Sequence, residues 1–592
     1  MSQIKKKSEI MRVLKYFRKI TRSQKWLLSL VVLWRIWAAL VSLALPIYYS
    51  QIIDIITNST WIEKSIVVTS LLSVLFLILL LEIWSVLSWR IVWFSIIPME
   101  ISNMKKIFTE CFEYLHKHSY RFFANNFSWS LVKRLNKLAY SYENVADIFV
   151  FDILQLVISF PFIIIVIFNK NWVIWVIFSV FTLVYGILQY IFYKMNIPYE
   201  IESNKHDSKI TWELADTITN NFNILTFTSL KREIHRFTNT LDAWWKITRK
   251  TWTRGEWIRL ISDIMLVSFE ILVIYFSIKL RWKSLISAWT IVLIQAYIFK
   301  IFDQMFTLWY LFKRLNRSVW ESIEMLDILD EGHEIVDKTQ EKLKVKNWKI
   351  EFKNVYFEYN EWNKIFQWLN LKIKQWERVA LVWHSGSWKT TITKLLLRLF
   401  DIQWWEILID GQNISNVTQQ SLRSNISMVP QDPILFHRSL KENMYYANPG
   451  ASDEEIIAAS KMARCHDFIS WLKDGYNTLV WERWIKLSGW ERQRVAIARI
   501  ILENKRILVL DEATSSLDSE SEQLIQEALD IAMKNKTVIV VAHRLSTIMK
   551  MDRIVVMEDW KIIESWSHKE LLASPNGTYK KLRDIQSWGF IE

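Results

Sequence analysis

Long runs of apolar residues dominate the first half of the chain. Six stretches contain or approach the ~20 apolar residues that cross a bilayer as a helix: 26–56, 66–91, 148–168, 172–193, 258–278 and 285–312. The first stretch is too long, and has the wrong flanks, for a cleaved signal peptide. We therefore expect a transmembrane region of six crossings over residues 26–328, preceded by a short arm, residues 1–25.

Basic residues indicate the orientation of these crossings. Lys and Arg are frequent in the arm and in two long polar segments, 98–147 and 196–256, whereas the connections at 58–63 and 169–171 are short and nearly uncharged. The positive-inside rule then puts both termini and both long segments in the cytoplasm of a multi-pass cytoplasmic-membrane protein. We expect the crossing helices to continue through the two long segments and fold back.

The pattern changes after Arg314. A charged linker, residues 329–347, precedes short β-rich runs that alternate with amphipathic helical stretches over residues 348–592. This alternation is typical of an α/β domain with a largely parallel sheet. The fold class is therefore a multidomain membrane protein, with an N-terminal six-helix transmembrane bundle, long cytoplasmic helical extensions and a C-terminal α/β domain.

Composition excludes several classes of protein. A chain with 51% hydrophobic residues is not disordered, and two cysteines, Cys111 and Cys465, do not make a disulfide scaffold or a Cys-rich zinc module. The net charge of +14 leaves nucleic acid or an anionic membrane face as possible partners. The motifs described below favour the membrane, and we expect no nucleic-acid partner.

Glycine and tryptophan have abnormal frequencies. The chain has 10 glycines and 34 tryptophans, whereas glycine alone usually supplies about 7% of residues, here roughly 40. The two residue types together make up about that usual glycine share. One hypothesis is that many of these tryptophans are glycines, encoded by a UGA codon that the source reads as glycine.

A phosphate-binding motif follows an apolar strand at 379–382. The segment reads Trp383-His384-Ser385-Gly386-Ser387-Trp388-Lys389-Thr390-Thr391, and a helix is predicted from Ile392 to Phe400. A phosphate loop has the pattern G-x-x-x-x-G-K-[ST] between a strand and a helix, and only its two glycines are replaced here, by Trp383 and Trp388. Because the loop presents bare backbone N–H groups to the phosphates, an indole at either position would occupy the phosphate site.

Three further motifs follow the phosphate loop in the order expected of one protein family. They are Leu487-Ser488-Gly489-Trp490-Glu491, a strand that ends in Asp511-Glu512, and a strand that leads to His543. With these motifs, the whole chain resembles a half-size exporter of the ATP-binding cassette (ABC) family. The resemblance implies an α/β P-loop NTPase cassette, ATP and Mg²⁺ as its ligands, and ATP-driven export of a lipid, an amphiphilic drug or a peptide.

The resemblance also implies roles for individual residues. Residues 383–391 would bind ATP, with Lys389 between the β- and γ-phosphates, and Tyr359 would stack on adenine. Mg²⁺ would be held by Thr390, Gln431 and Asp511. Glu512 would act as the general base, and His543 would contact the γ-phosphate.

A second half-transporter, identical or different, is the expected protein partner. In the family, the signature Leu487–Glu491 of one subunit completes the nucleotide site of another subunit, and Asp518 would lie at the shared interface. The segments 119–126 and 218–227 resemble the short helices that touch the cassettes in exporters. Arg35, Glu82 and Glu270 lie in apolar stretches, where ionisable groups are costly; they are either functional or paired with each other or near the interface.

The departures from the family pattern are all of one kind, glycine replaced by tryptophan. A tryptophan stands where the family has glycine at several positions: Trp383, Trp388, Trp404, Trp405, Trp481, Trp484, Trp490, Trp560 and Trp566. A systematic codon reading explains this set better than independent mutations do. If the indoles are real, the alternative is a membrane scaffold or an inactive subunit that cannot hydrolyse ATP. A cassette-gated channel or regulator is a further alternative.

Overall fold

The computed structural model describes residues 3–57, 64–359, 364–383, 389–480, 487–511, 519–541, 545–558, 561–574 and 577–588. The chain divides into two compact units. Unit 1 comprises Met1–His116 and Phe127–Gly332, and unit 2 comprises Lys117–Asn126 and His333–Glu592. A short piece of the N-terminal half is therefore part of the unit that contains the C-terminal domain.

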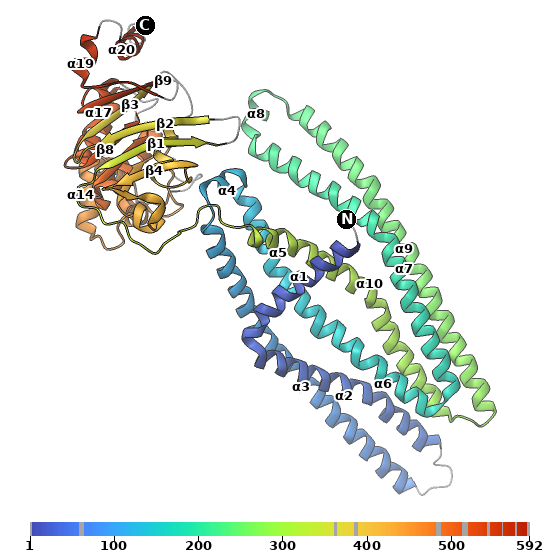
Figure 1. Cartoon of the computed structure of the whole chain (residues 1–592). Coiled ribbons are helices and arrows are strands. Elements are labelled where there is room, and N and C mark those ends of the chain that lie inside the picture. The colour runs from blue at the N-terminus through green and yellow to red at the C-terminus, as the bar shows by residue number, and fades with distance from the viewer. Residues whose placement is uncertain are drawn as a thin grey trace. The chain divides into compact units, whose positions relative to one another are not determined.

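Unit 1 consists of long helices (Figure 1). Among the described residues, six helices are long and apolar enough to cross a membrane, which confirms the six crossings by length and composition. The longest has 53 residues, or ~80 Å at 1.5 Å per residue, against ~30 Å of hydrocarbon. The predicted helical extensions beyond the bilayer are thus confirmed. The elements are α1 (Gln3–Thr21), η1 (Arg22–Gln24), α2 (Lys25–Thr57), α3 (Lys64–His116), α5 (Ser128–Asp147), the π-helical turn η3 (Ile148–Ile153), α6 (Leu154–Lys170), α7 (Trp172–Thr219), α8 (Asn221–Thr226), α9 (Leu230–Trp282) and α10 (Ala288–Asp330).

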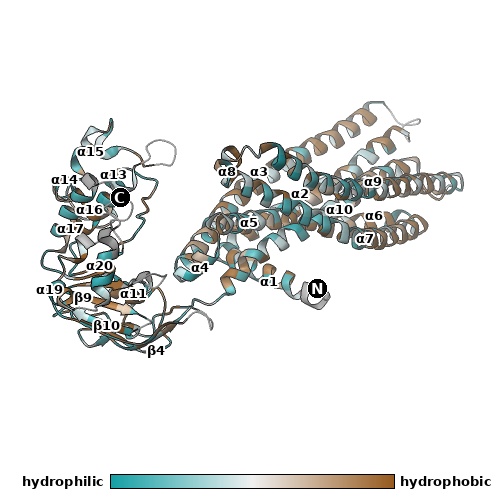
Figure 2. Ribbon diagram, turned by 90° about the horizontal axis from the view of Figure 1, so that it is seen from above, coloured by the Kyte–Doolittle hydropathy of each residue, from teal (hydrophilic) through white to brown (hydrophobic). Residues whose placement is uncertain are grey.

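Aromatic side chains fill part of the core of unit 1. The rings of Phe181 and Phe269 stack with centroids 3.8 Å apart, and the buried Tyr297 hydroxyl donates to the Leu43 carbonyl at 2.9 Å. The outward surface is also apolar, and Phe76 is 60% exposed. Figure 2 shows brown, hydrophobic residues along these helices. A helix surface of this kind is suited to lipid rather than water.

The three ionisable residues noted in the apolar stretches differ in environment. Arg35 is 4% exposed, donates to Gln155 Oε1 at 2.7 Å and lies over the Trp89 ring at 4.7 Å. Glu270 accepts a hydrogen bond from the Gln295 amide, whereas Glu82 is exposed. Arg35 and Glu270 thus each have a local hydrogen-bond partner, although Arg35 Nε has none among the described residues.

Unit 2 contains two β-sheets. The four-stranded antiparallel sheet has the order β2-β1-β4-β5, and the six-stranded sheet has the order β10-β9-β3-β8-β7-β6. In the second sheet all pairs are parallel except β9 with β10. The strands are β1 (Ile350–Glu358), β2 (Lys364–Ile373), β3 (Arg378–Trp383), β4 (Trp404–Ile409), β5 (Gln412–Asn413), β6 (Ile426–Val429), β7 (Ile507–Asp511), β8 (Thr537–Val541), β9 (Arg553–Glu558) and β10 (Lys561–Trp566).

Two hydrophobic cores lie against opposite faces of the six-stranded sheet. Leu508 and Leu510 belong to one core, and Ile507 and Val509 belong to the other, because successive side chains of a strand point to opposite faces. The predicted α/β fold is therefore confirmed. The helices of unit 2 are α4 (Tyr120–Asn125), α11 (Lys389–Leu396), η4 (Ile414–Asn416), α12 (Gln419–Arg423), α13 (Leu440–Tyr445), α14 (Asp453–Met462), α15 (His466–Trp471), η5 (Gly475–Asn477), α16 (Gly489–Glu503), α17 (Ser519–Met533), α18 (Leu545–Ile548), α19 (His568–Ala573) and α20 (Thr578–Trp588).

A buried arginine attaches the linker to unit 2. Arg398 is 1% exposed and pairs with Asp401 at 2.8 Å and with Asp337 at 3.4 Å. Its guanidinium also donates to the Val336 and Val417 carbonyls. A buried cation is tolerated only when its donors are satisfied, so these contacts hold the linker in place.

Candidate functional site

Four neighbouring parallel strands lead to the predicted nucleotide motifs. Strand β3 ends at Trp383, β7 ends at Asp511, β8 ends two residues before His543, and β6 ends two residues before Gln431. The strands lie in the order β3-β8-β7-β6, and neighbours in a sheet are about 4.8 Å apart. Their carboxyl ends therefore bring four motifs to one edge, where open α/β sheets bind ligands.

The phosphate-loop segment lies between a strand and a helix. Strand β3 ends at Trp383, and α11 begins at Lys389. His384, Ser385, Gly386, Ser387 and Trp388 lie outside the described residues, as do the side chains of Trp383, Lys389 and Thr390. Thr391 is fully buried in the first turn of α11. The phosphate contacts of this segment therefore stay a prediction.

Tyr359, the candidate adenine contact, lies beside α11. Its hydroxyl is 3.1 Å from Thr391 Oγ1. Its ring meets the rings of Phe357 and Phe400 nearly edge-on, with centroids 5.0 and 5.1 Å away. The side chain is thus fixed next to the predicted phosphate loop, although its role as an adenine contact stays a prediction.

Two candidate Mg²⁺ ligands follow adjacent strands. Asp511 is 3% exposed at the end of β7, and Gln431 is exposed after β6. Val429 of β6 pairs with Leu510 of β7, so both oxygen-bearing side chains belong to the same part of the sheet edge. Carboxylate and amide oxygens suit Mg²⁺. Among the described residues, no cluster of three His, Cys, Asp or Glu side chains could hold a metal ion.

The predicted catalytic residues lie outside the description. Glu512 and Asp518 fall in the undescribed segment 512–518, and His543 falls in 542–544. Trp481 and Trp484 in 481–486, and Trp560 in 559–560, are also undescribed. Asp511 pairs with Val541 across β7 and β8, so the strands that precede the two predicted catalytic segments are adjacent in the sheet. The roles of Glu512, His543 and Asp518 stay predictions.

The signature segment starts helix α16. Ser488 is the N-cap: its Oγ accepts from the Glu491 N–H at 3.3 Å, and the Glu491 carboxylate accepts from the Ser488 N–H at 2.8 Å. This reciprocal arrangement is a capping box. Within the part of the chain that the structure describes, the N–H groups of Gly489 and Trp490 have no hydrogen-bond acceptor. Such free N–H groups at a helix start are suited to an anion.

The Trp490 indole lies to the side of this helix start. The Arg494 guanidinium lies over the ring at 4.4 Å, and Phe468 meets it edge-on at 6.4 Å. Burial lowers the pKa of Arg494 below its usual value, and its Nη1 donates to the Arg464 carbonyl. Leu487, just before the cap, is 7% exposed in the core. The Trp490 indole therefore packs against Arg494 and Phe468 and forms no hydrogen bond with the N–H groups at the start of α16 among the described contacts.

Sequence reasoning did not find the cavities of unit 1. One, of about 410 Å³, lies among α7, α9 and α10. Gln189 and Asn196, on its wall, are 4% and 3% exposed, and among the described residues Gln189 Oε1 and Asn196 Oδ1 accept no hydrogen bond. Gln189 lies inside the predicted crossing 172–193. A polar residue within an apolar run is the one sequence feature that points to this cavity.

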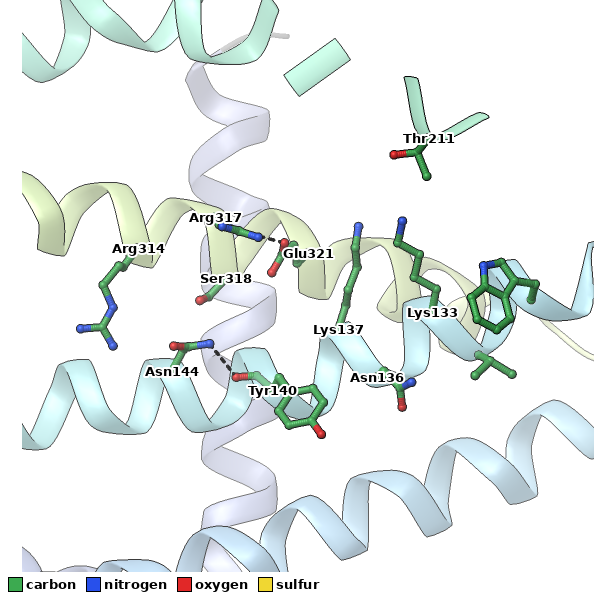
Figure 3. Close-up of a pocket in the computed structure, with 12 residues that line it drawn as sticks. Lys133, Asn136, Lys137, Tyr140, Asn144, Thr211, Arg314, Arg317, Ser318 and Glu321 are labelled. Carbon is green, nitrogen blue, oxygen red and sulfur yellow. Dashed lines mark hydrogen bonds and ion pairs between the residues drawn. The ribbon is translucent and has the colours of Figure 1, made fainter. Parts of the chain in front are cut away.

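A second cavity, of about 740 Å³, lies mainly between α5 and α10 (Figure 3). Figure 3 shows the amino groups of Lys133 and Lys137 extended side by side from α5. Lys137 pairs with Glu324 at 3.3 Å, and Arg317 pairs with Glu321 at 3.1 Å. Neighbouring acids thus partner two of the cations that line this cavity.

Two family models match the chain. The model described as "ABC transporter" matches residues 366–515, and the model described as "ABC transporter transmembrane region" matches residues 28–254. Similarity to a solved structure of a bacterial Atm1-family ABC exporter with ATP bound covers 95% of this chain and 98% of that chain. It has a TM-score of 0.84 and 27% sequence identity.

Curated relatives are similar over part of their length. ATP-binding cassette sub-family B member 6 of Xenopus tropicalis is 32% identical over 486 residues, 81% of this chain and 56% of that protein. An uncharacterized ABC transporter ATP-binding protein of Haemophilus influenzae is 48% identical over 284 residues, 47% of this chain and 46% of that protein. The chain thus spans about half the length of these relatives.

Proposed function

Because the chain belongs to the ABC transporter family, with the transmembrane region of a half-size exporter fused to an ATP-binding cassette, we propose that it hydrolyses ATP to export a substrate across the cytoplasmic membrane. The observation that supports the proposal is the strand order β3-β8-β7-β6: the four strands that precede the phosphate-loop, His543, Asp511–Glu512 and Gln431 segments are neighbours in one parallel sheet. Both termini and the cassette lie in the cytoplasm in this proposal.

The chemistry at this edge is phosphoryl transfer to water. Lys389 binds the β- and γ-phosphates, Glu512 orients and deprotonates the attacking water, and His543 contacts the γ-phosphate. Thr390, Gln431 and Asp511 hold Mg²⁺, which when bound neutralises charge on the phosphate oxygens. Tyr359, fixed by Thr391 and Phe400, stacks on the adenine.

The working unit in this proposal is a dimer of half-transporters. One chain carries one cassette, and the free N–H groups of Gly489 and Trp490 at the start of α16 are donors suited to a phosphate held by the other cassette. Closing the two cassettes on ATP turns the helices outward, and hydrolysis resets them, a rigid-body alternation. Leu487, Ser488, Glu491 and Asp518 complete the shared interface.

Backbone conformation supports the glycine hypothesis for part of the tryptophans. Among the described residues, four tryptophans have positive φ: Trp348 (54°), Trp368 (65°), Trp376 (61°) and Trp405 (71°). A bulky residue at positive φ is an outlier, whereas glycine adopts this conformation without strain. Of these four, only Trp405 is among the nine tryptophans that stand where the family has glycine. The backbone therefore supports the hypothesis independently of the family pattern.

Trp376 gives the most specific support. The Glu377 N–H donates to the Lys374 carbonyl at 3.2 Å, which makes Lys374–Glu377 a β-turn with Trp376 at its third position. Positive φ at that position defines a type II turn, which strongly favours glycine. The Trp376 side chain is 42% exposed, so packing of the indole does not account for its conformation.

A similar backbone constraint applies at Trp348. The Asp410 carboxylate accepts from the N–H groups of Lys346, Asn347, Trp348 and Lys349. Burial alone would raise the pKa of Asp410, but these backbone hydrogen bonds lower it below its usual value. Such a concave row of N–H groups is built from backbone in turn conformations, and glycine at position 348 would form it without strain.

Peptide masses from the native source test this hypothesis. Trypsin releases Gln375–Arg378 and Val379–Lys389, which contain Trp376, Trp383 and Trp388. With glycine, each peptide is lighter by the difference between tryptophan and glycine at each position. Peptides with the full tryptophan mass would instead favour the inactive-subunit alternative, because indoles at positions 383 and 388 would obstruct the phosphate site.

Two variants test the ATPase. Glu512→Gln should abolish steady-state hydrolysis while nucleotide still binds, and unchanged turnover would remove Glu512 from its role. Lys389→Ala should abolish nucleotide binding, and retained tight binding would refute its assignment.

Flux in liposomes against an opposing gradient then separates a pump from a cassette-gated channel.

The substrate contacts the cavity among α7, α9 and α10. The amide oxygens of Gln189 and Asn196 need hydrogen-bond donors, and Met305 and Trp252 add apolar surface. An amphiphile with hydroxyl or amine groups satisfies both. Asn196→Leu should reduce the ATPase stimulation by such compounds and leave stimulation by purely apolar compounds unchanged; equal loss for both sets would contradict this placement.

A further inference from the structure

Helix α1 is firmly attached to unit 1 by one of its faces. Val13, Phe17 and Ile20 are 0%, 4% and 0% exposed. The Phe17 ring meets the Tyr142 ring edge-on at 5.4 Å, and Thr21 Oγ1 is 3.0 Å from the Tyr142 hydroxyl. The N-terminal arm, from Ser8 onward, is therefore an integral part of the bundle rather than a loose tail.

The exposed side of α1, and of the turn that follows it, is cationic. We use the name cationic face for Lys15 and Arg18 of α1, Arg22 of η1 and Lys25, the first residue of α2, which follow one another at intervals of three or four residues. Lys19 borders the face. All five side chains are exposed, and within the described part of the chain none forms an ion pair. The face thus presents a row of charge that the protein does not neutralise.

A neighbouring arginine, Arg12, is neutralised by acids of the same chain. Arg12 lies between the two faces and pairs with Glu9 at 3.1 Å, Asp327 at 2.7 Å and Asp330 at 2.5 Å. Asp327 and Asp330 are in the last turn of α10. Among the described residues, no acid forms an ion pair with the cationic face. Its charge is therefore available to an external anion.

The cationic face ends where the first membrane crossing begins. Lys25 is the first residue of α2, and Trp26, the next residue, is 69% exposed. Met11 is also 60% exposed, which adds apolar surface beside the cations. Figure 1 shows α1 turned away from the direction of α2, as expected of an amphipathic segment that lies in the interface.

We propose that the cationic face of α1 binds anionic lipid headgroups of the cytoplasmic leaflet. The inference rests on the proposed orientation, with the N-terminus in the cytoplasm. Cation clusters directly next to a crossing on this side attract anionic lipids, and all four cations of this face lie within the segment from Lys15 to Lys25, directly before the first crossing. Because Arg12 connects α1 to the end of α10, lipid bound to α1 also stabilises the segment that leads into the linker.

The experiment uses the full-length protein in nanodiscs of phosphatidylcholine, alone or mixed with phosphatidylglycerol. The readouts are the enrichment of phosphatidylglycerol around the protein, measured by mass spectrometry of co-purified lipid, and the ATPase rate. The test variant carries Lys15→Gln, Arg18→Gln, Arg22→Gln and Lys25→Gln. Its matched control removes four exposed lysines of unit 2: Lys461→Gln, Lys473→Gln, Lys534→Gln and Lys569→Gln.

The parent and the control should enrich phosphatidylglycerol, and high salt should reduce that enrichment. The test variant should not enrich it, and Arg18→Gln alone should bind it roughly fivefold more weakly. Arg18→Lys, which keeps the charge, should retain binding. The ATPase rate in phosphatidylcholine alone should be the same for all variants, so a failure of the lipid inference is distinguishable from a failure of the proposed ATPase.

Three results would overturn the proposal. One is equal enrichment in the parent and the test variant, and another is equal loss in the test variant and the control. The third is an unaltered lipid response together with loss of binding to a short DNA duplex or an acidic peptide, which would assign the face to another polyanion. Thermal unfolding checks that the test variant folds; if it does not, the single change Arg18→Gln decides.

Discussion

The two short helices at the turns of the long helical hairpins have similar compositions but different surroundings. Helix α4 (Tyr120–Asn125) lies between α3 and α5, and α8 (Asn221–Thr226) lies between α7 and α9. In α4, Phe122 is 5% exposed, the Tyr120 ring meets Phe400, and Lys394 lies over Tyr120 at 5.0 Å. In α8, Phe222 and Leu225 are 78% and 66% exposed. The apolar tip at α4 is covered within its own unit, whereas the tip at α8 is exposed within its own unit.

This difference bears on the proposed assembly. Phe227, directly after α8, is also 76% exposed, so three large apolar side chains gather at one hairpin end. Contiguous exposed apolar surface marks an interaction site. A single chain covers α4 with its own cassette unit, and we expect the cassette of the second half-transporter to cover α8 in the same way.

The largest expected effect comes from charging the uncovered tip. Phe222→Asp with Phe227→Asp should remove the apolar contact, since burial of each phenyl contributes about 1.5–3 kcal/mol. The loss corresponds to at least a hundredfold weaker contact, so transport should stop while nucleotide still binds. Transport in liposomes and ATP binding measure the two effects.

The control for this variant is Leu214→Asp, at another exposed apolar position of the same hairpin. It should leave transport close to the parent level. Normal transport by the double variant would show that transport does not require a partner contact at α8. The difference in exposure between the two tips would then be unrelated to transport.

The covered tip should respond to a change in its core. Phe122→Ala removes a buried phenyl that stacks on His118 at 4.0 Å, and such truncations cost about 3–5 kcal/mol. We expect α4 amides to exchange faster with deuterium, with a partial loss of transport. Phe123→Ala, at a neighbouring 38% exposed side chain, should change exchange much less. Equal exchange in both variants would argue against anchoring through Phe122.

Periodicity and motif spacing predicted much of this architecture. Apolar runs of sufficient length determine a membrane helix on their own, and both short helices lie within the segments 119–126 and 218–227. The cassette motifs could be ordered along one sheet edge because each follows an apolar strand. These features depend on neighbours in the sequence, and a single chain displays them without an alignment.

Features that depend on distant residues could not be predicted. The contact of Tyr120 with Phe400 joins positions 280 residues apart, and the four partners of Arg398 come from the linker and the cassette. The cavity of Gln189 and Asn196 needs three helices to form its wall. Likewise, positive φ at Trp376 is a property of a turn and not of the residue printed there.

The smallest expected effect compares two serines at the tips. Ser119 Oγ accepts from the Phe122 N–H at 3.2 Å and donates to Glu334 Oε2 at 2.5 Å, whereas Ser229, at the start of α9, makes no side-chain capping hydrogen bond. Ser119→Ala should cost about 1 kcal/mol, the usual contribution of an N-cap, and Ser229→Ala should cost much less. Hydrogen exchange of the first turns of α4 and α9 measures both changes. Equal protection losses at the two tips would mean that capping does not distinguish the covered helix from the uncovered one, and packing through Phe122 and Tyr120 would then carry the whole difference.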